Sequence, residues 1–134
     1  MSMITIKGND YPYNETEVLN FAEGLIGMPD MRRAVLIPLD DCKPFCWLAS
    51  LDDEKYRFIV VDPNEIFADY HPDAPSAAVS AELKTLAIVK VCSDWTKTTV
   101  NLRAPIFINR ETNSGVQSIL SDNNYRLEEA LPLN

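Results

Sequence analysis

The sequence predicts a mainly β fold, namely a compact antiparallel β-barrel-like or sandwich domain with one short helix. Short apolar or alternating segments recur along the chain, about eight to ten in all, and clusters of Gly, Pro, Asn and Asp separate them. No internal repeat divides the chain. Its 134 residues, 46% of them apolar, suit a single domain over residues 1–134 with a packed core.

The amino-terminal third predicts a hairpin followed by an irregular turn. Met3–Lys7 is short and β-branched, and Glu17–Phe21 is a second brief strand candidate. Asn9–Pro12 supplies turn-forming residues between them, so we expect these two strands to pair. Gly24–Asp30 contains two glycines and a proline, which favours a tight irregular turn.

The middle of the chain predicts a buried strand and a second hairpin. Ala34–Leu39 is a continuous apolar run, as expected of a strand covered on both faces. Cys46–Leu51 and Tyr56–Asp62 are β-like segments joined by four charged residues. Pro63 ends the second of them, because proline cannot donate a hydrogen bond to a central ladder.

The carboxy-terminal half predicts a helix and then three strands. Asp69–Ser80 contains two prolines and several alanines, which favours a loop followed by the short helix over Ser76–Lys84, with Ser76 as its N-cap. Thr85–Val91 is β-like and is expected to pair with Thr98–Asn109. Val116–Leu120 follows an Asn-Ser-Gly turn and would close the sheet.

The strand predicted over Thr98–Asn109 alternates between a core-facing and an outward-facing set. The apolar parity comprises Val100, Leu102, Ala104, Ile106 and Ile108, and the other parity comprises Thr99, Asn101, Arg103, Pro105, Phe107 and Asn109. Asn101, Arg103 and Asn109 have two interpretations: they hold a bulge beside Pro105 by bonding backbone groups, or they bind a partner. Phe107 shares their parity, so we count it with them as a candidate partner-binding residue; the alternative is that its ring packs inward.

Charge and hydropathy narrow the classes of partner. Twenty acidic against twelve basic residues give a formal charge of −8, which repels nucleic-acid phosphates and attracts basic proteins. We therefore expect no direct nucleic-acid binding. No apolar run reaches the roughly 18 residues of a membrane-spanning helix, and the amino terminus does not resemble a secretion signal. These features predict a cytoplasmic protein without membrane contact.

Residues with catalytic or metal-binding chemistry are few and poorly spaced. Three cysteines, Cys42, Cys46 and Cys92, are an odd number typical of free thiols in a reducing compartment, and the one histidine is His71. Their spacing lacks the two short pairs that a zinc site usually has. The acidic pairs lie in predicted turns, where solvated charge is usual, and no Gly-rich loop opens a helix. We expect neither metal, nor cofactor, nor enzymatic activity.

Four short segments of the sequence, in a fixed order and spacing, form a recognisable pattern. They are Phe21–Gly27, then Pro44–Phe45 with Leu48–Ser50, then Phe58–Pro63 with Asp69–Tyr70, and finally Val100–Asn109 followed by Gln117 and Tyr125. The last of them contains the pattern Asn-Leu-x-Ala-Pro-x-x-x-Asn. Together they closely resemble the bacterial flagellar assembly factor FliW family over nearly the full chain. Met28 stands where that family usually has phenylalanine.

The resemblance implies a compact antiparallel β-structure and an interaction protein. It implies binding to newly made flagellin and, in alternation, to the translational repressor CsrA, which relieves repression of flagellin mRNA. Because CsrA binds RNA, its surface is expected to be basic, and exposed acidic residues of this chain would attract it. The candidates are Asp52, Asp53, Glu54 and Asp69. We expect a monomer. Two other classes stay open, an enzyme of unknown chemistry and a small-molecule-binding β-barrel.

Overall fold

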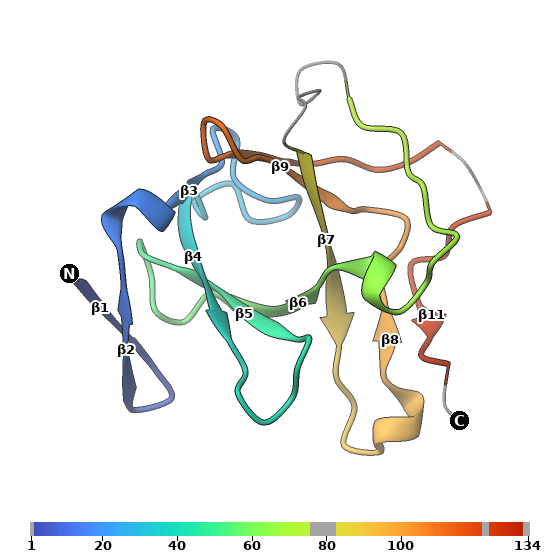
Figure 1. Ribbon diagram of the computed structural model, residues 1–134, viewed down its shortest axis with the longest axis horizontal. Helices are drawn as coiled ribbons and strands as arrows, with labels where there is room; N and C mark the ends of the chain where they lie inside the picture. The colour runs from blue at the N-terminus through green and yellow to red at the C-terminus, as the bar shows by residue number, and fades with distance from the viewer. Residues whose placement is uncertain (1, 76–82, 122–123, 133–134) are drawn as a thin grey trace.

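The computed structural model describes residues 2–75, 83–121 and 124–132, and it confirms a mainly β fold (Figure 1). The strands are β1 (Ser2–Ile6), β2 (Asn9–Tyr13), β3 (Leu19–Asn20), β4 (Arg33–Pro38), β5 (Cys46–Ser50), β6 (Arg57–Val61), β7 (Leu83–Lys90), β8 (Thr99–Val100), β9 (Ile106–Asn109), β10 (Ser114–Gln117) and β11 (Glu129–Ala130). Helical structure in these residues consists of short 3₁₀ turns: η1 (Glu15–Glu17), η2 (Pro63–Glu65) and η4 (Trp95–Lys97).

Strand pairing closes most of the sheet on itself. Neighbouring strands follow the order β7, β6, β5, β4, β3, β10 and β9, and β9 also pairs with β7. This last pairing completes a ring, which gives the barrel-like shape expected from the sequence and leaves its members without free edges. Strands β8 and β11 extend from one end of β7, outside the ring (Figure 1).

Strand β7 is long enough to pair with two successive strands, and the register changes between them. Val89 lies opposite Val100 of β8, whereas Leu86 lies opposite Ile106 of β9. A step of three residues along β7, from Val89 to Leu86, therefore faces a step of six residues along the other chain segment, from Val100 to Ile106. Residues 101–105 contain the excess, and they lie outside the regular strand pairing. We name them the 101–105 bulge. The single strand predicted over Thr98–Asn109 is thus two strands.

The predicted amino-terminal hairpin exists with a different partner. β1 pairs with β2, not with Glu17–Phe21, and the turn lies at Lys7–Gly8. These two residues have φ angles of 51° and 81°, the successive positive values that a two-residue hairpin turn requires. Pro12 is accommodated because the hairpin is a separate two-stranded sheet with open edges.

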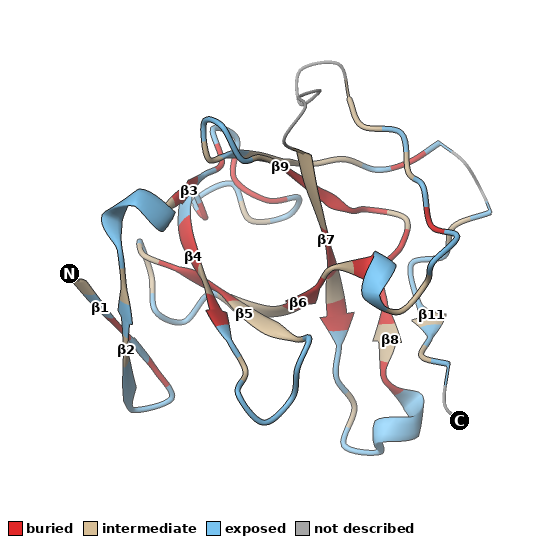
Figure 2. Cartoon of the chain, viewed as in Figure 1, coloured by how far each residue is buried: buried red, intermediate tan, exposed pale blue. Residues whose placement is uncertain are grey.

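The core is made of three packed clusters. Figure 2 shows that the buried stretches lie mainly along the strands, whereas most of the connecting loops are exposed. The interior of the ring contains fully buried Phe21, Leu48, Val60 and Ile106, so it is filled with side chains. A second cluster lies between the β1–β2 hairpin and β4–β5, and a third surrounds Tyr70 on the β7–β8 side. The ring is therefore packed on its inner face and on much of its outer face.

Three other predicted strands are confirmed, whereas the predicted helix is not described over most of its length. The strand and hairpin predicted over Ala34–Leu39, Cys46–Leu51 and Tyr56–Asp62 correspond to β4, β5 and β6. Most of the predicted helix, at residues 76–82, lies outside the described residues, and its last two residues, Leu83 and Lys84, begin β7. None of the helical segments in the described ranges has the length and apolarity needed to cross a membrane.

Candidate partner-binding groove

The 101–105 bulge is held by the side chain of Asn101. Its Oδ1 accepts hydrogen bonds from the backbone N–H groups of Arg103 (3.1 Å) and Ala104 (3.0 Å). Its own N–H donates to the carbonyl of Ile88, the last ladder bond before the chain departs from β7. The amide thus replaces ladder bonds that the bulge has lost, as a side chain of this length can do locally.

Gln117 ties the bulge to the turn formed by Gly24–Gly27. Its Nε2 donates to the Ala104 carbonyl (3.1 Å), and its Oε1 accepts from the N–H of Ile26 (2.9 Å). Gly24 holds that turn close, since it has a φ of 69° and a Cβ there would lie 2.5 Å from the Met28 carbonyl oxygen. The Gln117 side chain therefore fixes the relative position of two loops that are far apart in the sequence.

Tyr70 supports the bulge from the other side. Its buried hydroxyl donates to the Leu102 carbonyl, and its ring meets that of Tyr125 edge to face at 4.8 Å. Burial, and secondarily the nearby Tyr125, raises the pKa of Tyr70 well above its ordinary value. The phenol therefore remains a hydrogen-bond donor at any physiological pH.

A shallow apolar cavity of about 420 Å³ opens beside the bulge, and we name it the bulge groove. Its floor is formed by Leu25, Phe58 and Ile88, and its polar wall by Asn101, Arg103 and Gln117. Its rim carries three of the large apolar side chains that are exposed on this molecule, Ile26 (51%), Ile119 (63%) and Leu127 (57%). Such a concentration of exposed apolar surface is typical of an interaction site.

The structure places the four predicted strand residues in three different surroundings. Asn101 and Arg103 both line the bulge groove. Asn109 lies at the far end of β9, where its Oδ1 accepts from the N–H of Glu111 (2.9 Å) and caps a turn. Phe107 is fully buried, so its expected place on a partner-binding surface is wrong. Both faces of β9 are covered, and alternation therefore does not separate inside from outside there.

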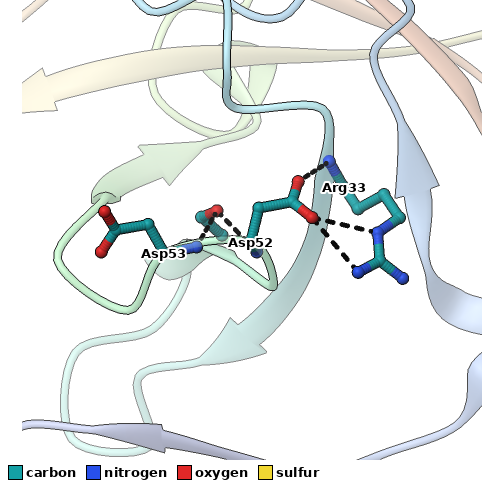
Figure 3. Close-up of polar contacts among 4 residues, drawn as sticks. Arg33, Asp52 and Asp53 are labelled. Atoms are coloured by element: carbon teal, nitrogen blue, oxygen red, sulfur yellow. Dashed lines mark hydrogen bonds and ion pairs between the residues drawn. The ribbon is translucent and has the colours of Figure 1, made fainter.

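Two acids of the loop at Asp52–Glu54 make contacts within the fold (Figure 3). The Asp52 carboxylate accepts from the Arg33 backbone N–H (3.0 Å) and lies 3.2 Å from the Arg33 guanidinium. Asp53 accepts from the N–H of Lys55 (3.0 Å), and its carboxylate points away from Arg33 in Figure 3. Asp69 follows β6 whereas this loop precedes it, so the four acids belong to two different loops.

These contacts predict that reversing the charge at Asp52 lowers the stability of the fold. Asp52→Lys removes an acceptor from the Arg33 N–H and places two cations together, so we expect a loss of about 1 kcal/mol in the free energy of unfolding. Glu54→Lys makes the same charge change at an exposed neighbour. Urea denaturation compares the two variants, and equal stabilities would show that the Arg33 contact contributes nothing.

The groups considered for catalysis or metal binding do not form a site in the described residues. His71 lines a small cavity with Asp73, Ser118 and Ser121, yet within residues 2–75, 83–121 and 124–132 no hydrogen bond joins it to a carboxylate or hydroxyl. The same part of the chain contains no group of three His, Cys, Asp or Glu side chains able to hold a metal ion. The three cysteines are free thiols.

The rim residues of the groove, which the sequence did not indicate as binding residues, are aliphatic residues in loops. Ile26, Ile119 and Leu127 come from three segments that only the folded chain brings together. The one available signal was an isolated large aliphatic residue beside turn-forming or charged neighbours, as in Ile26-Gly27 and Leu127-Glu128. That signal is weak, because single exposed aliphatic residues are common on protein surfaces.

Comparison with known proteins identifies the family. The family model described as FliW protein matches residues 4–131. The flagellar assembly factor FliW of Clostridium botulinum is 34% identical over 126 residues, covering 89% of each chain, and that of Thermotoga maritima is 33% identical over 127 residues, covering 88% of this chain and 85% of the relative. A solved structure titled as a crystal structure of the flagellar assembly factor FliW superposes with a TM-score of 0.88 at 26% identity, covering 99% of both chains. The chain belongs to the FliW family of flagellar assembly factors.

Proposed function

We propose that this protein is a non-enzymatic cytoplasmic regulator that binds flagellin and, in alternation, the translational repressor CsrA. Binding to CsrA would release flagellin mRNA for translation, and flagellin would compete for the regulator. Direct contact with nucleic acid has no part in this proposal, and the protein would act as a monomer. Family membership and the net charge of −8 support it.

The single observation that carries the proposal is the bulge groove. It offers an apolar, rigidly supported surface whose walls are fixed by hydrogen bonds from Asn101 and Gln117. A protein partner can bury this surface, and rigid walls reduce the entropic cost of binding. The interior of the ring is filled by side chains such as Leu48 and Val60, which does not favour a small-molecule-binding barrel.

A competition experiment tests the proposal. The immobilised chain is expected to retain purified flagellin and purified CsrA separately, and added flagellin is expected to displace CsrA. A labelled flagellin mRNA leader is expected not to be retained at physiological salt, because the net charge is −8. Retention of neither protein would contradict the proposed function, and retention of the RNA would contradict the exclusion of nucleic acid.

A further inference from the structure

A separate cavity of about 370 Å³ lies where the β1–β2 turn meets the loop between β5 and β6. We name it the basic cavity, and it is lined by Thr5, Lys7, Gly8, Glu54, Lys55 and Arg57. None of these residues lines the bulge groove. Three cations against one carboxylate give the lining a formal charge of +2, in a chain whose net charge is −8. The cavity therefore attracts small anions that the chain as a whole repels.

Packing of the hairpin on the sheet places these cations together. The β1–β2 hairpin packs against β4 and β5 through a buried cluster that includes Ile6 and Ala49, so Lys7, which follows Ile6, is held beside β5. Arg57, at the start of β6, lies opposite Ala49 in the ladder. Lys55 comes from the loop directly before Arg57. The cavity thus joins two segments that are far apart in the sequence.

The ring of Trp47 holds two of the cations without neutralising them. Lys7 Nζ lies 5.3 Å from the centroid of this ring, and the guanidinium carbon of Arg57 lies 5.6 Å from it. Both distances are short enough for cation–π attraction. An aromatic ring attracts a cation but carries no net charge, so the two side chains are held close together and their positive charge remains available to an anion.

Carboxylates do not pair with these cations in the part of the chain that the structure describes. Over residues 2–75, 83–121 and 124–132, ion pairs join Arg33 to Asp52 and Lys90 to Glu128, and neither pair reaches the basic cavity. Arg57 Nη1 donates to the backbone carbonyl of Glu54 (3.3 Å), which orients the guanidinium and leaves its charge unpaired. Three like charges close together repel one another, and a bound anion would relieve that repulsion.

The charge and the size of the basic cavity suit a phosphate group. A phosphate monoester carries a charge of about −1.5 to −2 at neutral pH, which matches the +2 of the lining. Lysine ammonium and arginine guanidinium groups are the usual donors to phosphate oxygens. The volume of about 370 Å³ is more than ten times the roughly 30 Å³ of a water molecule, so a phosphate group with a small substituent fits. A nucleic acid would extend onto the surrounding acidic chain, which repels its further phosphates.

From these observations we infer that the basic cavity binds a phosphate dianion, either free or as the monoester of a small molecule, between Lys7, Lys55 and Arg57. The cavity is separate from the bulge groove, so the inference does not depend on the proposed function. It assigns a ligand to the junction of the β1–β2 hairpin with the sheet. Because both segments line the cavity, a bound phosphate would also fasten the hairpin to the β5–β6 loop.

Titration with two phosphate probes tests the inference. Inorganic phosphate and glycerol 3-phosphate are added separately to the full chain at neutral pH and a constant ionic strength of about 0.15 M. The chain has two tryptophans, so a Trp95→Phe variant reports on Trp47 alone. Because Lys7 and Arg57 lie over the Trp47 ring, we expect a saturable change in its emission with at least one probe, at a dissociation constant of about 1 mM or lower. Acetate, a monoanion, is expected to cause no saturable change.

Three variants make this titration specific. Arg57→Gln and Lys55→Gln each remove one cation from the cavity and are expected to weaken phosphate binding at least about fivefold. Lys97→Gln is the matched control, since Lys97 is exposed in η4 and does not line the cavity, and it is expected to change the affinity less than about twofold. Lys55 is also exposed, so Lys55→Gln keeps the test valid if Arg57→Gln is poorly folded.

The outcomes divide clearly. Tighter binding of glycerol 3-phosphate supports a monoester as the ligand, and tighter binding of inorganic phosphate supports the free anion. Absence of saturable binding with both probes would overturn the inference, as would equal weakening by Lys55→Gln and Lys97→Gln. A single-stranded RNA oligonucleotide that binds more tightly than both probes, and is weakened by Lys55→Gln, would overturn it as well, because the cavity would then be part of a surface for a polyanion.

Discussion

Replacing Phe107 with alanine is expected to lower the free energy of unfolding by about 3–5 kcal/mol, the usual cost of removing a buried aromatic ring. Phe107 is fully buried in the middle of β9, between Thr85 of β7 and Val116 of β10 in the sheet. The cavity left behind cannot close easily, because β9 pairs on both sides. Urea denaturation followed by tryptophan fluorescence measures the change.

Two further variants make this test specific. Phe107→Leu keeps much of the volume and is expected to recover more than half of the lost stability. Asn109→Ala, at the more exposed end of the same strand, removes only a turn-capping hydrogen bond and is expected to cost about 1 kcal/mol. A Phe107→Ala variant with wild-type stability and weakened flagellin binding would contradict the buried position and restore the surface role predicted from alternation.

Asn101→Ala is expected to lower the free energy of unfolding by about 2 kcal/mol and to weaken partner binding as well. The substitution leaves the N–H groups of Arg103 and Ala104 without their acceptor in a half-buried loop, and each such loss costs about 1–3 kcal/mol when water cannot compensate fully. Because the bulge forms one wall of the groove, its relaxation would also change the surface that a partner meets.

Asn101→Asp is the matched control for that prediction. Aspartate retains an oxygen at the same position that can accept from both N–H groups, so this variant is expected to keep most of the stability. Thermal unfolding of the three proteins, combined with flagellin titration, separates scaffold from recognition. If Asn101→Ala leaves the melting temperature unchanged while abolishing binding, the residue is a recognition group and the scaffold role is wrong.

The sequence predicted those parts of the fold whose signals are local. β4, β5 and β6 combine apolar runs with turn residues directly between them, and they form where expected. The sequence does not indicate β2 as the partner of β1, because Asn9–Tyr13 begins with two polar residues and contains a proline, and only Tyr11 and Tyr13 pack against the core. The Lys7–Gly8 turn was the better local signal.

The groove was harder to predict, because it depends on side-chain directions and on contacts between distant segments. A role for Asn101 in holding a bulge is one of two interpretations that the sequence allows, but nothing local shows that its side chain accepts from the N–H groups of Arg103 and Ala104. Phe107 was misplaced because alternation carries sidedness only where one face of a strand meets water. The rim of the groove combines residues that are far apart in the sequence, such as Ile26 and Leu127. They lie together only because the sheet closes into a ring.

Titrating flagellin into wild-type, Ile119→Glu and Val91→Glu chains by calorimetry shows whether the bulge groove is the partner-binding surface. Val91 is exposed and does not line the groove, so Val91→Glu is expected to bind like the wild type, whereas Ile119→Glu is expected to bind at least tenfold more weakly with an unchanged melting temperature. The same affinity for all three proteins, or a loss with Val91→Glu alone, would show that flagellin binds elsewhere on the chain.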